Sequence, residues 1–208
     1  MEVIDISWPI STATTGYKDR NVVNFVTTKS FDKDGVRDHD ITLSTHTGTH
    51  IDAAAHFMRD GKTIDEMNPT RTIGPCKVLD MIAVQEKITR DDLVDYDIQE
   101  GDIILLKTIN SATTATGKFT PHFVYLEESG ARYLAEKKIR AVGIDYLGIE
   151  HSQKDHPTHI ILMKHDIAII EGLRLQSVDA GDYFLVCLPL YLIGLEAAPA
   201  RAVLIKNI

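Results

Sequence analysis

The segment Leu43–His56 reads LSTHTGTHIDAAAH, in which histidines and an aspartate are interleaved with small residues. Three threonines and a glycine disfavour a helix here and suit an extended chain. Side chains alternate along a strand, so His46, His50 and Asp52 would project to one side, with Gly48 leaving open space between them. In a helix, Asp52 would point roughly 200° away from His50. The segment therefore predicts a strand that gathers two imidazoles and a carboxylate.

Two neutral imidazoles and a carboxylate match the ligand preferences of zinc, and also of manganese or iron. Three protein ligands leave a coordination position for water, and zinc in such an open site lowers the pKa of that water to about 7. His56 follows Asp52 by four residues. It could be a further ligand, but we favour a catalytic acid/base, because a hydrolase must protonate its leaving nitrogen.

The rest of the chain predicts an α/β protein in which strands outnumber helices. Its 208 residues fit one domain, spanning 1–208. Helices are predicted at Thr89–Val94, Leu126–Lys138 and Pro157–Lys164, from capping, one-sided apolar residues and an initial proline. Short apolar runs rich in β-branched residues predict strands at Val3–Ile4, Val22–Thr27, Ile41–Thr45, Lys77–Val84, Ile103–Thr108, Ala141–Asp145, Ile167–Glu171, Tyr183–Leu188 and Ala202–Lys206.

The composition argues against several classes of protein. Acidic residues (30) outnumber basic ones (22), and no basic cluster suggests nucleic acid as a partner. No apolar run approaches the ~20 residues needed to span a membrane, and no signal peptide is evident. Cys76 and Cys187 form no CxxC motif and are expected to be buried thiols. We therefore expect a cytoplasmic protein acting on a small molecule.

The segment His46–His56 resembles the HxGTHxDxPxH signature of the cyclase family, metal-dependent hydrolases that include bacterial kynurenine formamidases and isatin hydrolases. The likeness continues through Asp5-Ile6-Ser7, Gly61-Lys62-Thr63, Gly143-Ile144-Asp145 and Ile169–Leu173. It implies a swivelling β/β/α fold with a strand-rich mixed sheet and flanking helices. It also implies a homodimer or higher homo-oligomer in which subunits complete each other's sites. Ala54 stands where the signature carries proline.

The resemblance also implies roles for individual residues. His46, His50 and Asp52 would bind one metal. Asp52 and Glu171 would bridge to a second metal, also bound by His159, and His56 would be the acid/base. The residues alone do not choose His159 over its neighbours His156 and His151, and Glu171 alone could equally be a solvated glutamate at a strand end.

The implied reaction is hydrolysis of an amide C–N bond, most specifically of N-formylkynurenine to kynurenine and formate, with one or two zinc ions. The alternatives are a manganese-dependent hydrolase of cyclic amides such as isatin, and a metal- or small-molecule-binding module without catalysis. Trp8, Tyr17, Phe25 and Phe57 are candidates for an aromatic pocket, although core packing is the better prediction for them. Arg59 and Lys62 could attract a substrate carboxylate, but solvated loop charges are the simpler interpretation.

Overall fold

The main sheet closes on itself in this computed structural model, which describes residues 1–20 and 22–206. Closure results because β4 pairs with both β10 and β12. Neighbours β5, β7, β9 and β10 run parallel, and the other pairs are antiparallel. In spatial order the strands are β1 (Glu2–Asp5), β12 (Ala197–Lys206), β11 (Gly181–Pro189), β5 (Ile73–Asp80), β7 (Ile103–Lys107), β9 (Ala141–Ile144), β10 (Ala168–Glu171) and β4 (His50–Asp52).

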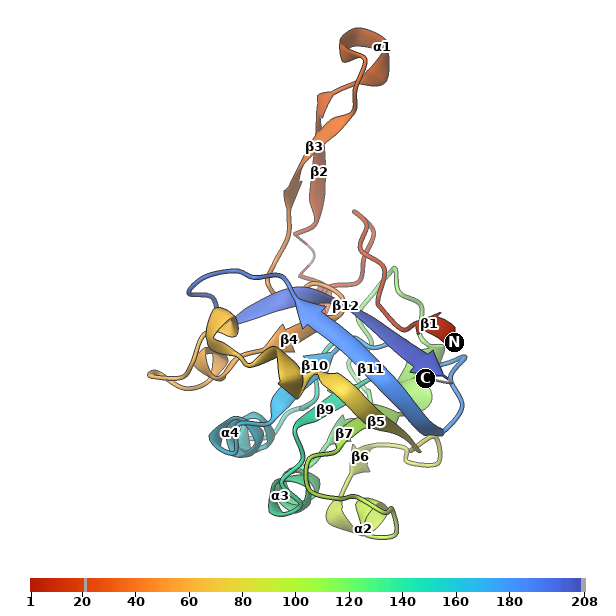
Figure 1. The fold of residues 1–208 in the computed structure, drawn as a ribbon, viewed down its shortest axis with the longest axis vertical. Coiled ribbons are helices and arrows are strands. Elements are labelled where there is room, and N and C mark those ends of the chain that lie inside the picture. Colours follow the sequence, from red (N-terminus) through yellow and green to blue (C-terminus); the bar gives the residue numbers. More distant parts are fainter. Residues whose placement is uncertain (21, 207–208) are drawn as a thin grey trace.

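Two hydrophobic cores lie on opposite faces of the sheet. Along β7, Ile103 and Leu105 point into the closed sheet, whereas Ile104 and Leu106 point out toward the helices. The helices α2 (Arg90–Leu93), α3 (Glu128–Glu136) and α4 (Pro157–Lys164) cover this outer face below the sheet in Figure 1. A strand that is buried on both faces has a continuous run of apolar residues, and such a run predicted β7. The predicted mixed α/β architecture is confirmed.

Most predicted elements are present, with shifted ends. Helix α4 has the predicted bounds, and α2 begins after Thr89, whose backbone N–H donates to the Asp92 carboxylate at 2.7 Å. The predicted strand Lys77–Val84 instead begins at Ile73 and ends at Asp80. Short elements that the sequence did not predict are β6 (Lys87–Ile88), β8 (Tyr125–Leu126) and the 3₁₀ turns Tyr17–Asp19, Ala54–His56, Ile64–Glu66, Pro69–Arg71 and Ile109–Ala112.

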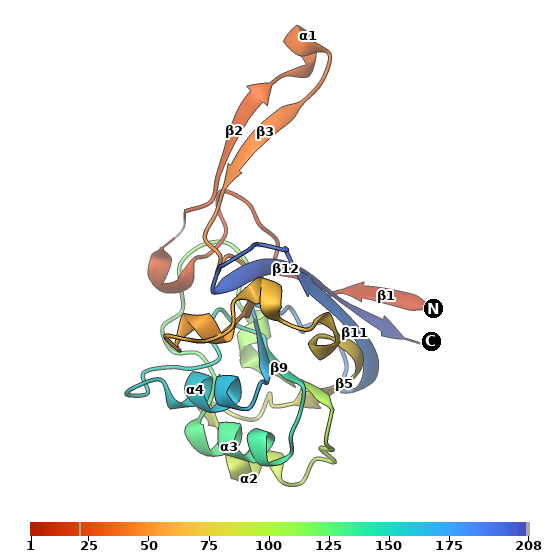
Figure 2. The same cartoon turned by 60° about the vertical axis from the view of Figure 1, so that its left-hand side comes forward.

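A hairpin projects from the body of the molecule (Figures 1 and 2). It consists of β2 (Asn24–Lys29) and β3 (Asp38–Thr42), joined through the short helix α1 (Phe31–Asp34). The prediction that Phe25 is a core or pocket residue was wrong. Phe25 lies opposite Ile41 in the hairpin, and the two are 40% and 61% exposed. An apolar strand pattern predicts a buried face, but neither Phe25 nor Ile41 is buried here.

Both cysteines are free and buried, as expected, on β5 and β11. Burial raises the pKa of each thiol to about 12, which makes them unreactive structural residues. No helix within 1–20 and 22–206 is long and apolar enough to cross a membrane.

Candidate metal centre

Neighbouring strands bring His50, Asp52 and Glu171 together on the outer face of the sheet. On β4, Ile51 packs inside the closed sheet, so its neighbours His50 and Asp52 point outward. Glu171 ends β10 directly opposite His50. The Nε2 atom of His50 lies 3.3 Å from Glu171 Oε2 and 3.5 Å from Asp52 Oδ1. Glu171 is only 4% exposed, so it is not a solvated strand-end glutamate.

His46 reaches the same cluster from a turn rather than from a strand. Strand β3 ends at Thr42 and β4 begins only at His50, so the predicted extended segment through His46 was wrong. His46 Nδ1 nevertheless lies 3.1 Å from Asp52 Oδ1. Gly48 has φ +62°, and a Cβ there would lie 3.1 Å from the carbonyl oxygen of Trp8. Glycine is therefore required by the turn and by close packing, not to leave space between ligands.

The structure distinguishes His159 from His156. His159 is buried on α4, and its Nε2 lies 3.4 Å from Glu171 Oε1 and 3.8 Å from Asp52 Oδ2. The side chain of His156, at the N-terminal boundary of α4, is 56% exposed. His151 also lines the pocket described below but is absent from the metal-ligand groups of the described chain. The geometry thus brings His159 to the carboxylates.

Glu150, which sequence reasoning missed, holds His159 in this orientation. Its Oε2 accepts a hydrogen bond from the backbone N–H of His159 at 3.1 Å and lies 2.8 Å from the imidazole Nδ1. The carboxylate is 5% exposed. With Nδ1–H donating to Glu150, the lone pair of Nε2 faces the cluster. The available signal for this role was the position of Glu150 directly after the buried run Ala141–Ile149, because a buried carboxylate needs a partner.

Glu196 has a similar but looser relation to His46. Its Oε1 accepts a hydrogen bond from Thr45 Oγ1 at 2.7 Å and lies 3.4 Å from His46 Nε2. Its side chain is 36% exposed. Glu196 directly precedes β12, and nothing in the local sequence connects it to His46.

The carboxylates favour positive charge at the cluster. Burial lowers the pKa of His50, but close contact with Glu171 and the charge of Asp52 outweigh burial and raise it to about 9. Burial likewise opposes protonation of His159, whose pKa Glu150 and Glu171 raise to about 10. Burial alone would raise the pKa of Glu171, yet His159 and His50 hold it well below its ordinary value. A divalent cation would displace protons from these imidazoles.

The donor atoms fit a metal. Of the eight buried side-chain polar atoms without a hydrogen-bond partner in the described chain, four belong to this cluster's ligand candidates: His46 Nε2, His50 Nε2 and both carboxylate oxygens of Asp52. Leaving buried polar atoms unpaired is costly. Two groups with ligand spacing share the Asp52 carboxylate, His46–Asp52–His56 and His50–Asp52–Glu171. Imidazole and carboxylate donors around a shared aspartate suit one or two divalent ions.

A cavity of about 570 Å³ opens from the cluster. Tyr17, Phe57 and Phe119 line it, so the aromatic role predicted for Tyr17 and Phe57 is compatible with their positions, whereas Trp8 is a buried core residue. His56 also lines the cavity, with its ring centroid 4.3 Å from that of His46. Burial lowers the pKa of His56, and the charge of Asp52 only partly offsets this effect.

A family model described as "putative cyclase" matches residues 4–151. The chain belongs to this cyclase family. A kynurenine formamidase of Bacillus cereus (strain ATCC 14579) is 32% identical over 205 residues, which cover 98% of this chain and 97% of that protein. A solved structure described as a potential metal-dependent hydrolase with cyclase activity is 42% identical, with TM-score 0.90 and coverage of 100% and 99%. Isatin hydrolase A from Ralstonia solanacearum shares the fold at 18% identity, with TM-score 0.85 and coverage of 99% and 92%.

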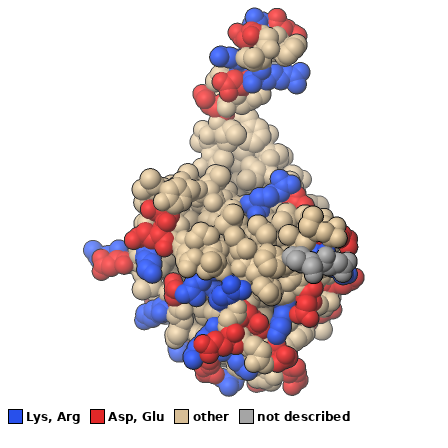
Figure 3. Space-filling model, viewed as in Figure 1, with Lys and Arg blue, Asp and Glu red and all other residues tan. Residues whose placement is uncertain are grey.

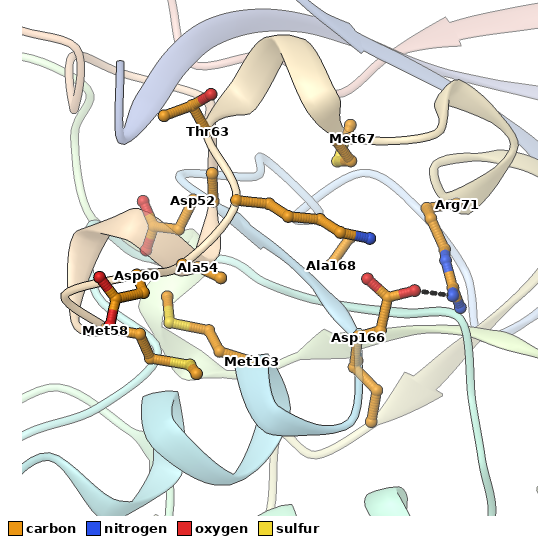
Figure 4. Close-up of a pocket in the computed structure, with 14 residues that line it drawn as sticks. Asp52, Ala54, Met58, Asp60, Thr63, Met67, Arg71, Met163, Asp166 and Ala168 are labelled. Carbon is orange, nitrogen blue, oxygen red and sulfur yellow. Dashed lines mark hydrogen bonds and ion pairs between the residues drawn. The ribbon is translucent and has the colours of Figure 1, made fainter. Parts of the chain in front are cut away.

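A second cavity, of about 380 Å³, also borders Asp52 (Figure 4). Asp52 lines both cavities. Lys62 and the ion pair between Arg71 and Asp166 line the second one, so Lys62 does not face the aromatic pocket. Arg59 lines neither cavity and is exposed, in keeping with a solvated charge.

Asp145, directly after β9, has a structural role. Its buried carboxylate accepts hydrogen bonds from the backbone N–H and hydroxyl of Thr108 and from those of Ser111, at 2.6–3.1 Å. These bonds fix the turn Ile109–Ala112 after β7. Burial raises the pKa of this carboxyl group despite the four donors.

Proposed function

We propose that this chain is a metal-dependent hydrolase of amide C–N bonds, and that its substrate is an aryl formamide such as N-formylkynurenine. The convergence of His46, His50, His159, Glu171 and Asp52 at the end of an aromatic-lined cavity carries the proposal. The full-length similarity to a kynurenine formamidase supports the C–N bond and the formamide.

The proposed ligand assignment divides the cluster into two positions around Asp52. His46 and His50 would hold one ion with Asp52, and His159 and Glu171 would hold the other with the same carboxylate. We propose zinc as the ion, with manganese as the alternative, since both accept these donors. A bound ion would polarise the amide carbonyl and lower the pKa of a water molecule.

His56 moves the proton in this proposal. Burial keeps its imidazole neutral near pH 7, because the pKa lies below the ordinary value. A neutral imidazole can take a proton from the attacking water and return it to the nitrogen as the C–N bond breaks. The rings of Phe57, Tyr17 and Phe119 would hold the aryl group so that the leaving nitrogen faces His56.

Metal stripping and reloading tests the proposal. Purified protein is freed of metal, reloaded separately with zinc and manganese, and assayed for formate release from N-formylkynurenine. Restored turnover supports both metal and substrate. If the metal binds tightly but no formate is released, the formamidase assignment fails, and hydrolysis of isatin by the same samples decides for the cyclic-amide alternative.

His56→Ala separates an enzyme from a binding module. General acid–base catalysis contributes typically 10²–10⁴-fold, so we expect kcat to fall by about that factor while metal content stays the same. His122→Ala, which removes an exposed histidine that does not line the cavity, is the matched control. Equal kcat in His56→Ala and wild type would remove His56 from the mechanism.

We further propose that the enzyme is a homodimer in which the hairpin packs on the second copy. A two-stranded hairpin is marginal in water by itself, yet this one exposes Phe25, Ile41 and Val26. The part of the hairpin next to the body shows almost no charged side chains in Figure 3, and the charged side chains gather toward the tip. Light scattering of Phe25→Ser/Ile41→Ser should show monomers, whereas Lys33→Ser at the tip should remain dimeric. Monomeric wild-type protein would refute the dimer.

We also propose that the protein is located in the cytoplasm, with which its free buried thiols are consistent.

A further inference from the structure

Acidic and basic side chains line opposite ends of the substrate pocket. The carboxylates in its lining, Asp52, Glu150 and Glu171, are all buried at the metal cluster. The lysine and arginine in its lining, Lys18 and Arg20, are exposed at the mouth. The pocket therefore runs from a deep end suited to metal ions to an outer end that carries positive charge.

The two cations at the mouth are not used for ion pairs within the described chain. No salt bridge to Lys18 or Arg20 forms within residues 1–20 and 22–206, and the Lys18 ammonium lies 5.3 Å from the Tyr17 ring centroid. The carboxylate in the same segment, Asp19, is directed elsewhere, because its Oδ1 accepts a hydrogen bond from the backbone N–H of Phe119 at 2.7 Å. Both cations are thus available to an anion that enters the pocket.

The segment that carries these cations is held in an unusual conformation. Lys18 and Asp19 have φ of +53° and +60°, which is unfavourable for residues with a Cβ. Two contacts hold it there: the Asp19–Phe119 hydrogen bond, and an edge-to-face contact between the Tyr17 and Phe119 rings with centroids 4.9 Å apart. The Tyr17 ring also packs against Gly148, where a Cβ would approach Tyr17 Cε2 to 3.2 Å. Strain maintained by specific contacts beside a pocket is typical of functional segments.

We infer that Lys18 and Arg20 form a subsite for a carboxylate at the far end of the substrate, so that the enzyme prefers aryl amides that carry a carboxylate over those that lack one. The inference rests on the proposed amide hydrolysis and specifies its substrate class. The amide lies at the metal cluster, the aryl ring lies against the contacting rings of Tyr17 and Phe119, and the carboxylate meets the two cations. A hydrogen-bonded ion pair at the outer end holds the substrate in one direction, with its amide inward.

Two formanilides that differ only in charge test the subsite. One carries a propanoate chain on the ring, and the other carries the corresponding propanamide. We expect Lys18→Gln/Arg20→Gln to reduce the propanoate-to-propanamide ratio of kcat/KM by about 10- to 100-fold, mainly through KM, as expected for loss of hydrogen bonds to a charged group. Lys87→Gln/Lys164→Gln removes the same charge from exposed positions that line neither cavity and should leave the ratio at the wild-type value.

A binding measurement separates failure of the subsite from failure of the proposed activity. Calorimetry with 3-phenylpropanoate on metal-loaded protein reports the subsite even without turnover, and a carboxylate bound only by the metal would bind wild type and Lys18→Gln/Arg20→Gln equally. Weaker binding to the variant supports the subsite. Equal binding, or equal losses of kcat/KM for both formanilides, overturns it. If neither formanilide is hydrolysed but the variant still binds 3-phenylpropanoate more weakly, the proposed activity fails and the anion subsite stands.

Discussion

The metal cluster has two halves that are built differently around the shared Asp52. In the inner half, Glu171 and His159 are 4% and 7% exposed and project from a strand and a helix. In the outer half, His50 is buried on β4, but His46 and His56 come from a turn and a 3₁₀ segment and are partly exposed. Regular structure fixes the direction of a side chain through its backbone hydrogen bonds, whereas a turn fixes it mainly by local packing.

Beyond its proposed ligands, each half also has a carboxylate next to a ligand histidine, and these two carboxylates likewise differ in burial. Glu150 makes two hydrogen bonds to His159 from a buried position, whereas Glu196 lies 3.4 Å from His46 and is partly exposed. Outer partners that orient a ligand imidazole typically contribute 10- to 100-fold in metal affinity. We therefore expect the inner position to be preorganised for a metal and the outer position to adjust on binding.

The largest effect is expected from a change that removes the distinction between the halves. Asp52→Asn takes away the anionic oxygens shared by both ligand groups. We expect metal affinity to fall by more than about 100-fold at both positions, beyond the usual range for outer partners. Metal content by mass spectrometry and formate release would measure this. Retention of one full equivalent of metal would show that the two halves do not depend on a common carboxylate.

A smaller effect sharpens the comparison between Glu150 and Glu196. Glu150→Gln should weaken one metal position by about 10- to 100-fold, while Glu196→Gln should change affinity by less than about threefold, because a partly exposed contact is screened by water. Titration of stripped protein with zinc, followed by calorimetry, resolves the two positions. Equal losses in the two variants would contradict the asymmetry between the inner and outer halves.

The elements that carry the inner half could be predicted from sequence better than the turn that carries His46, for a physical reason. The short apolar run before Glu171 and the proline that opens α4 identify regular elements. The roles of Glu171 and His159 came only from the family resemblance, because the residues alone did not separate a buried ligand from a solvated side chain. The predicted extended conformation of residues 43–49 was wrong, because the sequence does not show that Gly48 adopts φ +62° and so turns the chain. The sharing of β4 between β10 and β12 could not be predicted, since it joins segments about 120–150 residues apart through backbone pairing alone.

The smallest effect concerns the turn that brings His46 to Asp52. Gly48→Ala places a methyl group 3.1 Å from Trp8 O at a φ that alanine rarely adopts, at a cost of about 1–3 kcal/mol. Because the strain falls on the turn and not on β4, we expect the free energy of unfolding to fall by that amount. Affinity should fall only at the weaker metal position, since His46 can shift while His50 stays paired opposite Glu171. Urea unfolding and zinc titration check the two effects separately. A loss at the tighter position would show that the turn and β4 move as one unit, and the two halves would then differ only in exposure.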